Sequence, residues 1–202
     1  MKFYDCKNKE ISKSDFLKIY SNIYFYENPL SLEESITPIL NDGISNEYDI
    51  DTILSWKLGD LFKPITSIVE GKHEAMVRSY KVNLQTVYNI VIEKNGKDLF
   101  NAAAQIKGLG PIFTTTLLFF KSQMRYPIVD KFAYVALNAI MKEDKITVPQ
   151  EYHYQPNPEM FWKKYEDYQK DLNTVFGKAY QTDRTIDQAL WAYGHMFKIE
   201  ES

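Results

Sequence analysis

Two features in the second half of the chain have residue types and a spacing that could do chemistry. Gly108 and Gly110 flank one apolar residue, Leu109, and Asp130 is an isolated carboxylate in front of an apolar run. Glycines in a tight turn allow positive φ and a close approach to a ligand, because no Cβ intervenes. A helix that starts after such a turn presents backbone N–H groups and its positive dipole end, which favour a phosphate oxygen. We therefore expect residues 107–111 to contact a nucleic-acid backbone without reading its sequence.

Each of these features also has a simpler interpretation when it is taken alone. A G-x-G stretch is short and also makes an ordinary tight corner between two helices. Aspartate is a preferred N-cap, and Pro127 just before Asp130 ends the preceding helix. Both interpretations stay open for the single residues, and the two features read together favour a nucleic-acid site.

The elements that must position these residues are helices joined by short turns. Apolar residues recur at helical spacing in most segments, which predicts an all-α fold. Ser14 is expected to cap the first helix, and Ser31 with Glu34 forms a capping-box pattern in a helix that should stop near Gly43. The predicted helices cover residues 12–28, 31–42, 48–59, 83–96, 97–106, 111–123, 130–142, 158–176 and 184–197.

Two segments lack a clear helical pattern. Residues 60–82 are expected to form a loop with a short helix. Residues 143–157 contain two prolines and three aromatic residues and are expected to form a connecting loop.

The composition excludes several classes of protein. The chain has 202 residues, of which 45% are hydrophobic and 25% charged, so it can bury a core and form a folded domain. Cys6 is the only cysteine, which rules out an internal disulfide and a cysteine-based zinc or iron–sulfur site. The three histidines are scattered, so no metal and no cofactor are expected. No signal peptide and no apolar run of about 18 residues is present, which predicts a cytoplasmic protein without a membrane partner.

Charge is distributed unevenly along the chain. The net charge is −3, yet residues 27–60 carry eight acidic residues and one lysine. Residues 97–131, which include the glycine turn, carry five basic residues and two acidic ones. A net charge does not describe the local field, and the basic segment coincides with the expected phosphate contact.

Residues 102–140 resemble the signature of the helix-hairpin-helix DNA glycosylases. The resemblance is carried by the turn Ile106-Lys107-Gly108-Leu109-Gly110-Pro111 and by the triplet Ile128-Val129-Asp130 that follows it. The segment "IDQALWAYGHMF" also suits the closing helix of that family. The resemblance implies a single all-α domain over residues 1–202 with a helix-hairpin-helix motif near 98–123. It further suggests two lobes, one formed by 83–142 and the other by 1–82 with 158–202.

The resemblance implies a base-excision reaction on DNA. A damaged base would be flipped out of the duplex and its glycosidic bond cleaved, with Asp130 stabilising positive charge on the sugar or activating water. Bifunctional members carry a lysine two residues after the second hairpin glycine, and Ile112 stands there, so a monofunctional hydrolase is expected. Weaker candidates for a base pocket are Trp56 and Tyr193, for which core packing is the alternative. The residues expected on the DNA backbone are Lys107, Gly108, Leu109, Gly110, Lys121 and Arg125.

Two further hypotheses remain beside the glycosylase. The same fold could bind nucleic acid or protein without catalysis, with Asp130 acting only as a helix cap. The chain could also be an unrelated all-α interaction protein whose many tyrosines meet a partner. The acidic block at 27–60 is unusual for a DNA clamp and argues against tight duplex binding.

Overall fold

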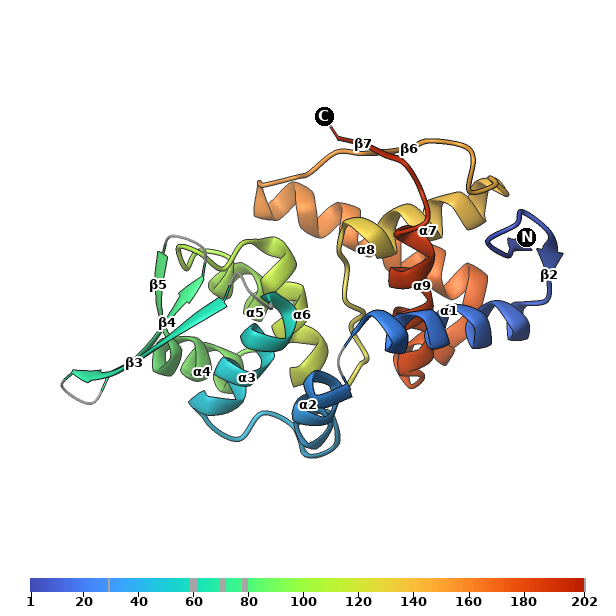
Figure 1. The fold of residues 1–202 in the computed structure, drawn as a ribbon. Helices are drawn as coiled ribbons and strands as arrows, with labels where there is room; N and C mark the ends of the chain where they lie inside the picture. The colour runs from blue at the N-terminus through green and yellow to red at the C-terminus, as the bar shows by residue number, and fades with distance from the viewer. Residues whose placement is uncertain (29, 59–61, 70–71, 78–79, 202) are drawn as a thin grey trace. The chain divides into compact units, whose positions relative to one another are not determined.

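The structure is a computed structural model that describes residues 1–28, 30–58, 62–69, 72–77 and 80–201 (Figure 1). Helices make up 66% of it, which confirms the prediction of a mostly helical protein. The chain divides into two compact units. Unit 1 consists of Met1–Pro29, Val129–Gln155 and Lys163–Ser202, and unit 2 of Leu30–Ile128 and Pro156–Trp162. The sequence suggested two lobes with different bounds, 83–142 and 1–82 with 158–202, and the division into those lobes stays a prediction.

Unit 1 is built around the helix α9. Its helices are α1 (Lys13–Glu27), α7 (Lys131–Lys142), most of α8 (Pro158–Phe176), the short 3-10 helix η2 (Gly177–Gln181) and α9 (Arg184–Gly194). Helix α9 packs against both α1 and α7. Two short strand pairs accompany them, β1 (Phe3–Tyr4) antiparallel to β2 (Glu10–Ile11) and β6 (Gln150–Tyr152) parallel to β7 (Ile199–Glu201). Part of the segment 143–157 therefore forms a strand where a loop was predicted.

Aromatic side chains fill the interior of unit 1. Phe16, Tyr20 and Tyr193 lie with ring centroids 4.8 to 5.1 Å apart, and each is at most 1% exposed. The Tyr20 hydroxyl donates to the backbone carbonyl of Tyr4, so this buried phenol is hydrogen-bonded. Tilted and edge-on contacts of this kind are the favourable geometries of aromatic pairs. Helix α9 is thereby held to α1 by large, well-packed rings.

The N-cap of the first helix is not the serine that the sequence suggested. Ser12, rather than Ser14, is the N-cap of α1, and its Oγ accepts a hydrogen bond from the Asp15 amide at 3.0 Å. Ser12 Oγ also donates to the Asp15 carboxylate at 2.7 Å. Ser12 and Asp15 therefore bond to each other in both directions, because Asp15 stands three residues after Ser12. Ser14 has no acidic residue at that spacing, so it could not form such a pair.

Unit 2 contains the helices α2 (Leu30–Asp42), α3 (Glu47–Leu58), α4 (Leu84–Glu93), α5 (Gly96–Ala103) and α6 (Pro111–Lys121). Helix α3 contacts α2, α4 and α6, and α5 contacts both α4 and α6.

Asn83 caps α4 by accepting a hydrogen bond from the Thr86 amide at 2.8 Å, as predicted. Gly43 follows α2 with φ +84, which confirms the expected end of that helix. Gly96 was expected to end α4, whereas it starts α5, because the backbone of Lys94 already closes α4.

A three-stranded antiparallel sheet lies in the segment for which the sequence lacked a clear helical pattern. Strands β3 (Phe62–Val69), β4 (Lys72–Val77) and β5 (Tyr80–Asn83) pair in the order β3-β4-β5 (Figure 1). The sequence predicted a loop and a short helix here. The β-branched residues of this segment suit strands, but strand pairing depends on contacts across the sheet that periodicity along the chain does not reveal. Gly59, the predicted end of α3, lies outside the described residues.

Among the described residues, no helix combines the length and the apolar character that a bilayer crossing requires.

Candidate nucleic-acid interface and active site

The turn between α5 and α6 carries the predicted hairpin in unit 2. The Ile106 amide donates to the Ala103 carbonyl and the Leu109 amide to the Ile106 carbonyl, both at 3.0 Å, so two tight turns link the helices. Gly108 lies within the second turn and has φ +99, a backbone conformation that residues with a side chain rarely adopt. Gly110 is the N-cap of α6 with φ −63 and ψ 174, and Pro111 occupies the first helical position.

The two glycines of the turn differ in what they contribute. Positive φ was expected at both, and it occurs only at Gly108, because Gly110 is extended and any residue could adopt its angles. The side chain of Leu109 is fully buried and anchors the turn to the core of unit 2. A contact of Leu109 with a phosphate could therefore involve only its backbone. The start of α6 supplies the amides and the positive dipole end that an anion prefers.

The predicted basic residues lie in the same unit as the turn. Lys107 and Arg125 are exposed, and Lys121 is partly exposed and donates to the Ile92 carbonyl at 3.4 Å. Exposed lysine and arginine side chains can neutralise phosphates without selecting a sequence. Their role on DNA stays a prediction.

Asp130 lies at the start of α7 in unit 1. It is the N-cap of that helix, as predicted, and its Oδ1 accepts a hydrogen bond from the Ala133 amide at 2.9 Å. The carboxylate is half-buried, and the preceding Val129 is buried. Burial, and then the negative charge of Asp130, raise the pKa of the buried Tyr168 phenol well above its ordinary value. The carboxylate is thus close enough to the α8 side chain Tyr168 to affect its proton.

His195, which the sequence did not select as a catalyst, lies near Asp130. It follows α9, and its ring centroid is 3.5 Å from that of Phe132 and 3.9 Å from that of Trp191. Burial against these rings lowers the pKa of His195, while the charges of Asp130 and Glu27 raise it to a smaller extent. No spacing in the sequence could have indicated this neighbour, because only the packing of α9 on α7 brings His195 to the start of α7.

The two residues proposed for a base pocket take part in packing. Trp56 Nε1 donates to Glu33 Oε1 at 2.8 Å, and its ring lies edge-on to Phe120 in unit 2. Tyr193 belongs to the aromatic interior of unit 1, where 1% of it is exposed. Their part in binding a base stays a prediction, and in this structure the core of unit 1 surrounds the Tyr193 ring.

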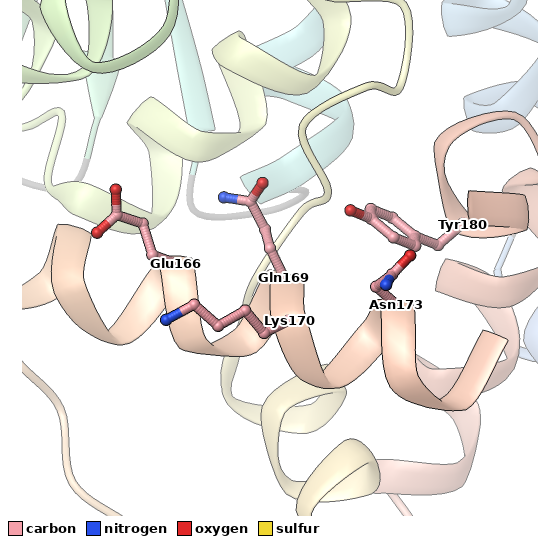
Figure 2. A pocket seen from close by; sticks show the side chains of 5 residues that line it. All are labelled: Glu166, Gln169, Lys170, Asn173 and Tyr180. Atoms are coloured by element: carbon pink, nitrogen blue, oxygen red, sulfur yellow. The ribbon is translucent and has the colours of Figure 1, made fainter. Parts of the chain in front are cut away.

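A polar hollow of 540 Å³ on α8 and η2 was not predicted. Figure 2 shows Glu166, Gln169, Lys170 and Asn173 along one side of α8, with the Tyr180 ring beside Asn173. Residues at this spacing share one helix face, which is the signal that the sequence offered. Lys170 Nζ is 2.9 Å from the Asp167 carboxylate, so its charge is already offset. The hollow offers the amides of Gln169 and Asn173, which both donate and accept hydrogen bonds, beside the carboxylate of Glu166.

Comparisons of the chain with family models, curated proteins and solved structures find no match. Within the described part of the chain, no three His, Cys, Asp or Glu side chains gather as metal ligands would. The functional assignment therefore depends on the residues themselves.

Replacing Gly108 by valine is expected to weaken DNA binding about tenfold or more. A β-branched residue is strongly disfavoured at φ +99, so the turn would change and the start of α6 would move away from a phosphate. Fluorescence anisotropy with a labelled duplex at fixed salt measures the affinity. Gly43→Val is the matched control, since Gly43 has φ +84 in the same unit and open space around it. Equal losses in both variants would show that general destabilisation, and not the turn, reduces binding.

The stability of the protein is expected to fall in mild acid because of His195. Its pKa is lowered in the folded state from the ordinary value of 6.5, so below 6.5 the unfolded chain binds the proton more readily. This contribution to the free energy of unfolding is present above pH 6.5 and is lost as the pH falls toward the folded pKa. Urea unfolding at pH about 7.5 and about 5 measures it. His195→Gln should lose less stability between the two pH values than the wild type; an equal loss would contradict the assignment.

Proposed function

We propose that this protein binds DNA through the turn between α5 and α6 and hydrolyses the N-glycosidic bond of a flipped base with the help of Asp130. The observation that carries the proposal is the backbone of that turn, with Gly108 at φ +99 and Pro111 at the first position of α6. This is the geometry that lets a chain bring a helix start close to a phosphate. The resemblance to the helix-hairpin-helix glycosylases adds Asp130 as the carboxylate of the reaction.

The reaction needs little from the protein beyond a positioned carboxylate. The bond between C1′ and the base nitrogen breaks, and its electron pair leaves with the base. The sugar carries positive charge in the transition state, which an ionised carboxylate stabilises. The oxygen of a water molecule then bonds to C1′, and a proton acceptor takes one proton from that water. The nitrogen of the departing nucleobase is protonated from solvent.

Ile112 supports hydrolysis rather than attack by an amine. It is the second residue of α6 and provides no nitrogen that could form an imine with the sugar. The expected product is an intact strand with an abasic site. Alkali would be needed to break that strand.

A second candidate function is DNA binding without catalysis. The hydrogen bond between the Ala133 amide and Asp130 Oδ1 gives this aspartate a role in the fold that needs no substrate. In that case the turn and the basic residues near it would act alone, and the chain would recognise the backbone of nucleic acid.

Base release from a panel of damaged duplexes tests the proposal. The panel should include deaminated, oxidised and alkylated bases, each incubated with the full chain and analysed with and without alkali. Release of a base with strand breaks only after alkali is the expected result. Strand breaks without alkali would show that a lysine forms an imine and would contradict the hydrolytic mechanism. Duplex binding without release from any lesion would favour the second candidate function.

A further inference from the structure

Helices α7 and α9 come unusually close together beside Asp130. A Cβ built on Gly194 would lie 2.1 Å from the backbone oxygen of Phe132 and 2.8 Å from its Cα. Such distances are far below van der Waals contact, so only glycine allows this crossing. Because Gly194 immediately precedes His195, the crossing fixes the imidazole against the first turn of the helix that Asp130 caps.

The position of the His195 ring is further defined by aromatic contacts. It stacks on Phe132 at an interplanar angle of 25°, and it also contacts Trp191 from its own helix. The Lys131 ammonium lies 4.9 Å from the Phe132 ring centroid. Although aromatic rings cover it on two sides, His195 is exposed to solvent, so protons can reach it. The imidazole is therefore both held in place and accessible.

Three charged groups act on His195 from the helices around it. Glu27 belongs to α1, and Asp130 and Lys131 lie at the start of α7. The two carboxylates favour the protonated imidazole, while Lys131 and burial oppose it, and burial has the largest effect. At neutral pH the ring is accordingly a neutral base with a carboxylate nearby, which is the condition required of a proton acceptor.

We propose that His195 is the proton acceptor of the reaction and that Asp130 stabilises the positive charges that arise beside it. This inference rests on the proposed function and divides the two tasks that Asp130 alone would otherwise perform. The water that attacks C1′ gives one proton to an imidazole nitrogen as its oxygen bonds to the sugar. The imidazolium passes this proton to the departing base or to solvent, and Asp130 stays ionised throughout.

A titration followed by NMR tests the pair without any substrate. The imidazole C–H resonances of the three histidines would be recorded against pH for the wild type, Asp130→Asn and His153→Gln. Loss of the nearby carboxylate should lower the pKa of His195 in Asp130→Asn. The exposed His153 serves as the control, because its removal should leave the His195 titration unchanged. An unchanged His195 pKa in Asp130→Asn would overturn the pairing whether or not the protein releases bases.

The pH dependence of base release then tests the role in the reaction. The wild type should lose activity on the acidic side as His195 is protonated, with an apparent pKa below 6.5. His195→Gln should lower the rate about 100-fold or more and should lack this acidic limb. His153→Gln should retain both the rate and the limb. An acidic limb that persists in His195→Gln would overturn the role of His195 as acceptor.

The two possible failures are distinguishable. If the wild type releases no base from any lesion, the proposed function fails and with it the catalytic role of His195. If bases are released but the His195 resonance does not respond to Asp130→Asn, only the pairing fails.

Discussion

Replacing Asp130 by asparagine is expected to reduce base release about 100-fold or more while the fold and the DNA affinity are retained. Asparagine is as good an N-cap as aspartate, so its side-chain oxygen can still accept the hydrogen bond from the Ala133 amide. In the proposed mechanism, the substitution removes the negative charge that stabilises the sugar. Single-turnover base release measures the rate, and the circular dichroism melting curve shows whether the stability of the fold is retained.

The matched control for this substitution is Asp183→Asn. Asp183 is the N-cap of α9 in the same unit, and its Oδ1 accepts from the Thr185 amide at 3.0 Å. The two variants make the same chemical change at the same kind of position. Asp183→Asn should release bases at the wild-type rate. Full activity of Asp130→Asn would exclude Asp130 as a participant in the reaction, and equal losses in both variants would point to a change in stability.

Substitution of Gly194 by alanine is expected to lower the free energy of unfolding by about 3 kcal/mol or more, at the upper end of what overpacking costs. The added Cβ would meet the oxygen, carbonyl carbon and Cα of Phe132 at 2.1, 2.5 and 2.8 Å. These are backbone atoms, so no side chain can rotate away, and α7 and α9 must separate. A loss of this size is a large share of the stability of an ordinary domain. Urea unfolding measures it.

Gly177→Ala provides the comparison for Gly194→Ala. Gly177 has φ +64 with no atom within 4 Å of an added Cβ, so its substitution brings backbone strain without a clash. This strain costs about 1–2 kcal/mol for an L-residue in the left-handed region. A larger loss at Gly194 than at Gly177 is therefore expected. The opposite order would mean that the two helices can shift apart at little cost.

Local signals in the sequence predicted much of the chain correctly. Helical spacing located most helices, and the caps Asn83 and Asp130 and the first-turn Pro111 were read from residue types alone. These features depend on groups within a few residues of one another, so the local sequence contains the cause. The positive φ of Gly108 is likewise a local feature, which follows from the residue type in the turn.

The errors arose where a distant part of the chain decides the local structure. Strands β3 to β5 exist through their mutual pairing, and β6 pairs with β7, which follows it only after helices α8 and α9. The N-cap of α1 is the exception, because Ser12 and Ser14 both suit a cap and a local neighbour, Asp15, decided between them. The packing of Tyr193 against Phe16 and Tyr20 in the core of unit 1 likewise depends on distant parts of the chain, and its role in a base pocket stays a prediction.

The sequence by itself determined a mostly helical protein, a glycine turn before a proline-started helix, and an aspartate that caps the helix after it. Only the tertiary structure brought His195 to the start of α7, because this neighbourhood depends on how closely two helices far apart in sequence can cross. That distance is set by the missing side chain of Gly194 against the backbone of Phe132. A contact between helix backbones leaves no periodic pattern along the chain, so it becomes visible only once the helices are packed.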